Sequence, residues 1–268
     1  MDRRVAFIAV VACTALLVGA APAWAADGPA QEAPSAATAK SPAADARSRQ
    51  EALEKLDLDK PLVDDPELKR LESDAPIWIN GPRKKVVLVG AVCQRESPLE
   101  LFACLSGSKE YESVVAVRAR ASTLHAALVA IGLEPGAAAE YGDTFTPARG
   151  PVVEITLIWN DEQGRRRNAR AQDWIRSLKT GKPMNHPFVF VGSRFHEGPD
   201  GQRVYAADVT GDLICVTNFP DAVLDIPVQS TDDDASLLFQ SFTERIPPRG
   251  TPVTLVLSPR EEKKPASR

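Results

Sequence analysis

The sequence predicts an α+β fold: a single mixed, mostly antiparallel, β-rich domain with two or three short helices. Short runs of β-branched and aromatic residues recur along the chain, and clusters of Gly, Pro, Asn and Asp separate them. This pattern is typical of strands joined by tight turns. Apolar stripes at helical spacing are few and short. Because hairpin-like connections dominate, the pattern favours α+β over a doubly wound parallel sheet.

The N-terminus carries a pattern typical of a secretory signal peptide. Arg3 and Arg4 precede an uncharged apolar run over residues 5–21, and small residues occupy the −3 and −1 positions of a cleavage site after Ala25. The alternatives are an uncleaved anchor, for which the run is short, and a lipoprotein cleavage box at residues 10–13. The sequence therefore predicts an exported protein, periplasmic or extracellular.

Composition divides the chain into five parts. These are the signal peptide (1–25), a disordered Ala/Pro-rich linker (26–46), a charged helical or extended arm (47–73), the globular domain (74–259) and a disordered tail (260–268). The linker has hardly a large apolar residue, so it cannot bury enough surface to offset its ordering entropy. In the arm, leucines recur at helix-like intervals, but two prolines break any long helix. The domain is long enough for one sound core.

The domain is expected to begin with a group of short strands. An apolar run at residues 77–79 comes just before an Asn-Gly-Pro turn. Residues 86–92 and 113–117 are rich in β-branched residues, which favours strands. Residues 99–105 are expected to pair with the strand at 86–92 as a hairpin, because turn-forming residues lie between the two.

Residues 121–131 are predicted to form a helix. Leu124 and Leu128 lie on one apolar stripe. Ser122 is a candidate N-cap and Gly132 a stop signal. This is the clearest helical pattern in the chain.

A second hairpin is predicted from residues 152–159 and 165–169, with an acidic turn between them. The arginine run at 165–167 is the strongest basic feature of the chain. Because it follows the acidic turn, a solvated hairpin explains it better than a binding patch. The net charge of −4 at pH 7 also argues against a nucleic-acid partner, which would need a basic face.

The remaining elements are shorter. Residues 188–191 are wholly apolar, as in a buried central strand, whereas residues 171–178 show a helical stripe around Trp174. The other expected strands are 203–207, 213–216 and 254–257, and residues 237–242 fit either a helix or a strand.

Three cysteines follow the predicted signal peptide: Cys93, Cys104 and Cys215. In the expected hairpin Cys93 and Cys104 come close, so a disulfide is predicted between them, worth about 3 kcal/mol. Cys215 lies in an apolar run and is expected to be a buried core thiol. The alternative is a metal site of Cys93, Cys104 and His125, although zinc sites usually show closer cysteine pairs. No metal or other cofactor is therefore expected.

Acidic residues near position 110 are the candidates for chemistry. Glu110 and Glu112 alternate along an expected strand and would share one face, and Glu100 lies among apolar residues. Neighbouring carboxyl groups can drive their pKa values apart, as acid–base catalysis requires. A solvated charged turn is the other interpretation. No HExxH, GxSxG, P-loop or GxGxxG motif occurs in the sequence, so no catalytic residue is predicted outright.

Several short motifs follow one another in a specific order along residues 86–257. Among them are Gly90-Ala91-Val92-Cys93, Lys109-Glu110-Tyr111-Glu112, Ala171-Gln172-Asp173-Trp174, Gly211-Asp212-Leu213-Ile214-Cys215 and Ile246-Pro247-Pro248-Arg249-Gly250. In this order they resemble the YdjY domain of exported bacterial proteins. The resemblance implies no particular reaction. The family pattern has a histidine where Tyr111 stands, and an iron–sulfur label on some relatives requires cysteines that this chain lacks; both departures argue against a metal centre.

The sequence thus favours an exported, non-enzymatic domain that binds an unknown protein or small ligand in the periplasm or at the cell surface. The support is the export pattern, the long linker and the lack of catalytic motifs. Past the signal peptide, no run is long and apolar enough to span a bilayer. The alternative is a hydrolytic or metal-assisted enzyme that uses Glu100, Glu110, Glu112 and His125 near Cys93 and Cys104.

Overall fold

The computed structural model describes residues 51, 55–198, 200–231 and 237–261. All of them belong to one of the two units into which the chain divides, residues 40–268. The predicted signal peptide and linker, and most of the predicted tail, lie outside the described residues.

The fold is β-rich, which corrects the predicted α+β class. Strand accounts for 37% of the described residues and helix for 10%. Apart from the single residue Glu51, helix in the described ranges is confined to α2 (Ala121–Ala130), α3 (Ala206–Thr210) and the 3-10 turn η1 (Ala171–Trp174). The helix expected over residues 171–178 is only η1 followed by a strand. Trp174 lies in this single turn and is fully buried. One large buried side chain with apolar neighbours gave the sequence the apolar spacing of a helix, although no longer helix forms.

The described strands agree with most of the expected ones to within a few residues, and residues 237–242 contain a strand rather than a helix. In chain order they are β1 (Lys69–Arg70), β2 (Ile77–Asn80), β3 (Lys85–Val92), β4 (Leu101–Leu105), β5 (Ser113–Val117), β6 (Glu140–Tyr141), β7 (Phe145–Thr146), β8 (Val152–Asn160), β9 (Arg166–Arg170), β10 (Ile175–Ser177), β11 (Phe188–Phe190), β12 (Phe195–Glu197), β13 (Arg203–Tyr205), β14 (Asp212–Cys215), β15 (Leu224–Asp225), β16 (Phe239–Ser241) and β17 (Pro252–Pro259).

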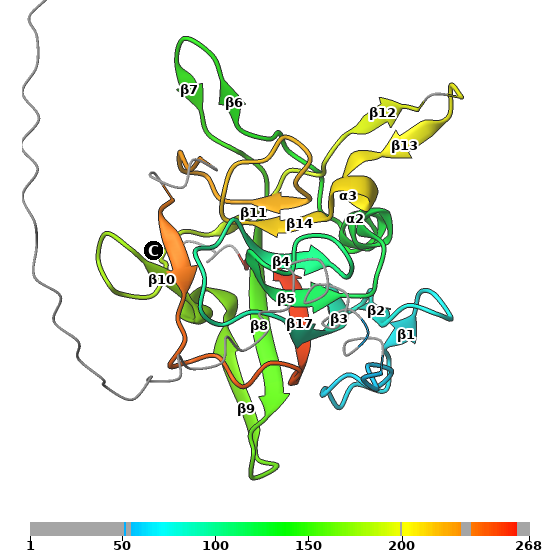
Figure 1. Ribbon diagram of the computed structural model, residues 1–268. Helices are drawn as coiled ribbons and strands as arrows, with labels where there is room; N and C mark the ends of the chain where they lie inside the picture. The colour runs from blue at the N-terminus through cyan, green and yellow to red at the C-terminus, as the bar shows by residue number, and fades with distance from the viewer. Residues whose placement is uncertain (1–50, 52–54, 199, 232–236, 262–268) are drawn as a thin grey trace, which may run out of the picture. The chain divides into compact units, whose positions relative to one another are not determined.

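Eight of these strands close into a barrel (Figure 1). The order is β3, β17, β8, β11, β15, β14, β4 and β5, and β5 pairs with β3 to complete the ring. Most neighbours are antiparallel, but β4–β5 and β14–β15 are parallel. β2 and β1 extend the sheet from β3, and β9 pairs with β8 beyond the part of β8 that contacts β11.

The ring closes at Gly90, which lies opposite Val117 of β5. A Cβ atom at this position would lie 2.4 Å from the carbonyl oxygen of Ala116, closer than any side chain tolerates. Glycine in a strand interior often marks such a close approach of two backbones. The absence of a side chain at position 90 therefore lets β5 seal the barrel against β3.

The expected hairpin between residues 86–92 and 99–105 does not form. β4 pairs with β5 and β14, and β5 lies between β4 and β3. The turn-forming residues after β3 misled the prediction because turn chemistry shows only that the chain changes direction. The β4–β5 connection is also unusual, since a parallel pair normally needs a crossover of about a dozen residues or more, and residues 106–112 are all that join these two strands.

Side chains that face the inside of the barrel form the main core. Along β8, Ile155 and Leu157 are buried whereas Glu154 is exposed, as expected of a strand with one covered face. Leu157 lies opposite Leu255 of β17, and Leu255 lies opposite Leu88 of β3. These residues belong to one cluster, so the register around the ring aligns the apolar rows on its inner face.

The structure confirms the predicted helix as α2, which buries Leu124 and Leu128. Its predicted N-cap is wrong, because Arg120 occupies that position without a side-chain cap. Ser122 instead donates from its N–H and its hydroxyl to the Asp208 carboxylate of α3, at 3.0 and 2.6 Å. Asp208, which is distant in sequence, thus accepts a hydrogen bond from a backbone N–H in the first turn of α2 that has no partner within the helix. No helix in the described ranges is long and apolar enough to cross a membrane.

The segment before β2 packs on the outer face of the barrel. From here on, the arm means residues 55–68 of the predicted 47–73 segment. Leu58 is buried against Trp78, Val87 and Val89, and the Leu62 N–H donates to Thr254 Oγ1 at 2.8 Å. The arm therefore covers apolar side chains of β2 and β3 that would otherwise face solvent.

Candidate functional site

Glu100 and Glu112 are brought together by the parallel pairing of β4 and β5. The strands start in register, with Leu101 opposite Ser113. The N–H groups of Glu100 and Leu101 both lie 3.2 Å from the Glu112 carbonyl oxygen, and the two carboxyl groups interact. Of the predicted catalytic set, these are the two that the structure places side by side.

Lys109 completes this group, which we call the carboxylate cluster (Glu100, Lys109, Glu112 and Asp212). Its ammonium lies 2.8 Å from Asp212 Oδ1, as an ion pair rather than a well-directed hydrogen bond, and 4.0 Å from Glu112 Oε1. It also lies 4.1 Å from the centre of the Phe219 ring, within range of a cation–π interaction. Burial, the largest single effect, would lower the pKa of Lys109, but its acidic neighbours, Asp212 foremost, together raise it.

Glu112 has a strongly perturbed ionisation. Burial and the neighbouring Glu100 carboxyl group raise its pKa to about 7, against the opposing effect of Lys109. Tyr111, which is 58% exposed, places its phenol close to the Glu112 carboxylate, and burial followed by the Glu112 charge raises the pKa of Tyr111. A carboxyl group that exchanges its proton near neutral pH can act as a general acid or base.

The other two predicted catalytic residues serve the fold elsewhere. The Glu110 carboxylate accepts a hydrogen bond from the Gly107 N–H and so closes the turn after β4. His125 Nδ1 lies 2.8 Å from the Gly192 carbonyl oxygen and 3.0 Å from the Tyr205 hydroxyl. Its ring also packs edge-on against Phe190 and Tyr205. His125 thus fastens α2 to the segments around β11 and β13.

The cysteines lie together on the outer face of β3, β4 and β14. Cys93, Cys104 and Cys215 are buried in a small cluster with Ala116, and all three are free thiols. Burial, and for Cys93 the adjacent Cys104, raise the thiol pKa values of Cys93 and Cys215. Cys215 is therefore the buried thiol that its apolar neighbours predicted.

The predicted Cys93–Cys104 disulfide is absent from this structure, and the sheet order disfavours it. The Cys93 N–H donates to Val114 of β5, whereas Cys104 lies opposite Ala116 on the other edge of β5. The two cysteines therefore project from strands on opposite edges of β5, although their thiols are close enough to interact. A disulfide also needs Cα atoms closer than about 7 Å, a condition that strands separated by a third strand do not readily meet.

The alternative metal site is not assembled either. Nowhere in the described part of the chain do three Cys, His, Asp or Glu side chains gather in an arrangement that could hold a metal ion. His125 bonds to Gly192 and Tyr205, and neither cysteine is among its contacts. The set of Cys93, Cys104 and His125 is therefore not brought together.

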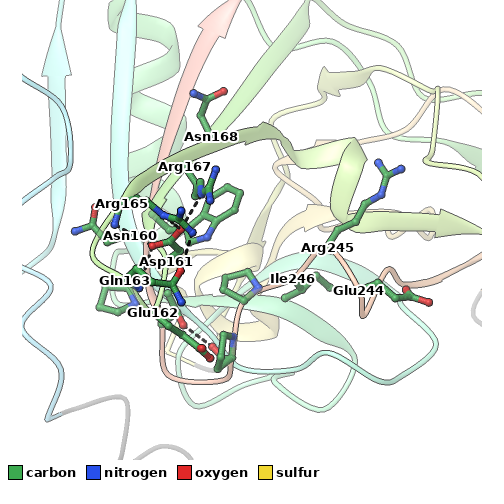
Figure 2. A pocket seen from close by; sticks show the side chains of 15 residues that line it. Asn160, Asp161, Glu162, Gln163, Arg165, Arg167, Asn168, Glu244, Arg245 and Ile246 are labelled. Carbon is green, nitrogen blue, oxygen red and sulfur yellow. Dashed lines mark hydrogen bonds and ion pairs between the residues drawn. The ribbon is translucent and has the colours of Figure 1, made fainter.

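A groove of about 860 Å³ lies between the β8–β9 hairpin and residues 244–252 (Figure 2). We call it the hairpin groove. Its apolar lining comes from the largely buried Trp159 and from Pro247, Pro248 and Pro252. Tryptophan and proline have few rotatable bonds, so this lining loses little conformational entropy when a ligand binds.

Two arginines share one carboxylate at the rim of the hairpin groove (Figure 2). The Nε–H groups of Arg165 and Arg167 each donate to Asp161 Oδ2 at 2.9 Å, and the backbone N–H groups of Gln163 and Arg165 donate to Oδ1. Although desolvation acts in the opposite direction, these hydrogen bonds lower the pKa of Asp161 to about 2. The turn thus holds both guanidinium groups in place on the same face of the hairpin.

A second groove of about 490 Å³ lies on the opposite face of the hairpin, against the arm. Ile158 and Arg166 line it from the hairpin, and Asp64 and Asp65 line it from the arm. Because side chains alternate along strands, Trp159 and Arg167 face one groove and their sequence neighbours Ile158 and Arg166 face the other.

Sequence reasoning missed Asp212 of the carboxylate cluster and Phe219, whose ring lies against the Lys109 ammonium. Asp212 is almost fully buried, and a carboxylate at the start of an apolar strand is a signal that could have been followed, since a buried charge requires a partner. The hairpin groove was missed because its far wall, residues 244–252, is distant in sequence from the hairpin. No local pattern announces such a pairing.

A family model adds one finding to this geometry. The YdjY domain model matches residues 77–258, which confirms the resemblance drawn from the motifs. No curated protein and no solved structure matches the chain.

Proposed function

The chain belongs to the YdjY domain family, and from this premise we propose that it is an exported, non-enzymatic binding domain that takes a partner or ligand in the hairpin groove. The export part of the proposal is supported by the N-terminal pattern of basic residues, apolar run and small residues before position 26. The mature protein should begin at Ala26, which intact-mass measurement of the exported chain checks.

The hairpin groove is the single observation that supports binding. Its volume of about 860 Å³ falls in the range of about 300–1,000 Å³ that is usual for ligand sites. It combines an apolar lining with a few polar groups whose positions are set by Asp161. Preorganised groups of this kind add affinity because little freedom remains to be lost on binding.

A photo-crosslinker tests this proposal in cells that export the chain. Benzoylphenylalanine replaces Gln163, which lines the hairpin groove, or, as the matched control, Gln202, an exposed residue on the β12–β13 turn. We expect a discrete adduct from position 163, about tenfold weaker when Arg167→Gln is added, and none from position 202. Equal adducts from both positions, or an adduct that ignores Arg167→Gln, would count against the groove as a binding site.

The second candidate function is hydrolysis by acid–base chemistry at the carboxylate cluster. The observation that favours it is Glu112, which holds a proton with a pKa of about 7 beside Glu100 and 4.0 Å from Lys109. Paired carboxyl groups with separated pKa values can serve as acid and base. In this candidate His125 and Glu110 play no part, because both are engaged elsewhere.

Turnover of nitrophenyl esters and glycosides separates the two candidates. If hydrolysis is the function, the rate should change around pH 7 and fall about a hundredfold or more in Glu112→Gln, whereas Arg167→Gln should leave it unchanged. If binding is the function, no turnover appears, and only the Arg167→Gln variant alters the adduct from position 163.

A further inference from the structure

The outer edge of β9 offers unpaired backbone groups. Among the described strands, β9 pairs only with β8, and the Asp161 N–H donates to the Arg165 carbonyl oxygen at 2.9 Å. In an antiparallel ladder the hydrogen-bonded pairs alternate, so Arg167 and Ala169 also bond to β8. The N–H groups of Arg166, Asn168 and Arg170 therefore point away from the sheet.

Of these three outward N–H groups, one is already used. The Arg170 N–H donates to Asp173 Oδ2 at 3.1 Å. In the part of the chain that the structure describes, the N–H groups of Arg166 and Asn168 make no hydrogen bond, and both residues are exposed. A short edge with two donors and two acceptors is thus open at positions 166–168, between the two grooves.

Positive charge lies on both faces of this edge. Arg165 and Arg167 project on the side of the hairpin groove and share the single carboxylate of Asp161. Arg166 projects on the other side and contacts Asp64 at 3.2 Å, but the Asp64 side chain is 94% exposed. Exposed pairs of this kind contribute little to stability, so an incoming carboxylate can replace Asp64 beside Arg166 at small cost.

The charges decide what can occupy the edge. A second copy of this chain would place arginine rows opposite each other, and like charges in that position are destabilising. Charged residues on an edge strand protect it from such self-association. An extended segment that carries carboxylates meets guanidinium groups on both faces instead, because its side chains alternate between the two sides.

We propose that β9 is the docking edge for an extended acidic peptide segment, which adds to it as a further strand at positions 166–168. Such strand addition uses main-chain hydrogen bonds for affinity and side-chain pockets for specificity. The proposal rests on the proposed binding function and names its ligand class. The carboxylates of the peptide would lie over Arg165 and Arg167 on one face and over Arg166 on the other.

A fluorescently labelled peptide, Glu-Glu-Val-Glu-Glu-Val-Glu-Glu, tests the proposal against its counterpart with lysine at every glutamate position. Binding to the exported mature protein is followed by fluorescence anisotropy at low salt. We expect saturable binding of the acidic peptide, no binding of the basic one, and a loss of about tenfold or more in the Arg165→Gln, Arg167→Gln double variant.

The sharpest variant is Asn168→Pro, with Asn168→Ala as its matched control. The Asn168 N–H points away from β8, so proline removes an edge donor without breaking the β8–β9 ladder. We expect affinity for the acidic peptide to fall about tenfold or more in Asn168→Pro and to change less than about threefold in Asn168→Ala. Equal thermal unfolding midpoints of the two variants verify that both are folded.

Three results would overturn the proposal: equal binding of both peptides, binding of neither, or equal affinities of Asn168→Pro and Asn168→Ala. The third result means that the arginines attract charge without strand addition. If the acidic peptide does not bind but the crosslinker at position 163 still gives an adduct that depends on Arg167, the peptide proposal is wrong and the proposed binding function stands. If both experiments fail, both fall.

Discussion

Glu112 shows how one residue can couple this fold to pH. Its carboxyl group faces Glu100, and its side chain is only 15% exposed. Burial and the Glu100 charge both raise its pKa, and the compensating cation is distant, because Lys109 lies 2.8 Å from Asp212 but 4.0 Å from Glu112. Ionised Glu112 is therefore an incompletely compensated charge in the folded protein.

The free energy of unfolding should fall as pH rises from about 4.5 to about 7. Over this window folded Glu112, with a pKa of about 7, retains a proton that the unfolded chain, with an ordinary value of 4.5, has released. Each rise in pH then favours the unfolded state. Glu112→Gln cannot ionise, so it should remove on the order of 1–2 kcal/mol of this fall between pH 5 and 8. Urea unfolding of both proteins at half-unit pH steps measures the free energy of unfolding across this range.

Two comparisons make the pH experiment specific. Burial raises the pKa of Asp225 to about 7 as well. Part of the fall in the free energy of unfolding with pH should therefore remain in Glu112→Gln and disappear only when Asp225→Asn is added. Glu162→Gln, at the exposed β8–β9 turn, should leave the slope as in the unmodified protein. A Glu112→Gln protein with an undiminished slope would show that this carboxyl group is ionised normally.

Sequence reasoning predicted part of this cluster for a local reason. Glu100 and Glu112 lie at the starts of two short β-rich runs, and runs of that kind pair with each other often. Asp212 and Phe219 could not be predicted in the same way. Asp212 lies in β14 and Phe219 follows it, and both come near Lys109 because β14 pairs with β4 across a long stretch of chain. Such pairings depend on the whole barrel rather than on neighbouring residues.

Among the elements, β5 has the largest effect on the fold, because its position sets the strand order and closes the barrel. Strand propensity and turn chemistry predicted β3, β4 and β5 individually, since both are local properties. They could not predict the order, because β5 inserts between β3 and β4 and closes the barrel. The close approach at Gly90 makes that insertion possible, and a lone glycine in a strand pattern indicates a close approach without saying which strand approaches.

The order of these strands predicts the state of the cysteines. Because β5 separates Cys93 from Cys104, both should remain free thiols even in an oxidising compartment, where neighbouring thiols normally form disulfides. Alkylation of the exported protein in denaturant without reductant, followed by peptide mass spectrometry, should find Cys93, Cys104 and Cys215 all modified. A Cys93–Cys104 linked peptide would show instead that β3 and β4 move together after folding.

At the scale of the whole molecule, the arm extends the fold beyond the family match, which begins at residue 77. Leu58 is buried against Trp78, Val87 and Val89 on the outside of the barrel. Asp65 accepts hydrogen bonds from the Asn80 amide at 3.0 and 2.9 Å. The arm thus supplies the outer layer for two strands whose inner faces already fill the barrel core.

A chain that begins at residue 74 should therefore be less stable than one that begins at residue 47, by about 3–5 kcal/mol, because it exposes apolar side chains of β2 and β3 to water. Leu58→Ala in the longer chain should account for about 2–4 kcal/mol of this difference, since it removes a fully buried side chain. Leu71→Ala, at a residue that is 39% exposed, is the matched control and should cost less than about 1 kcal/mol. Urea unfolding measures all four proteins. Equal stability of the chains that begin at residues 47 and 74 would mean that the arm does not stabilise the barrel, and that covering the outer face of β2 and β3 with Leu58 contributes little.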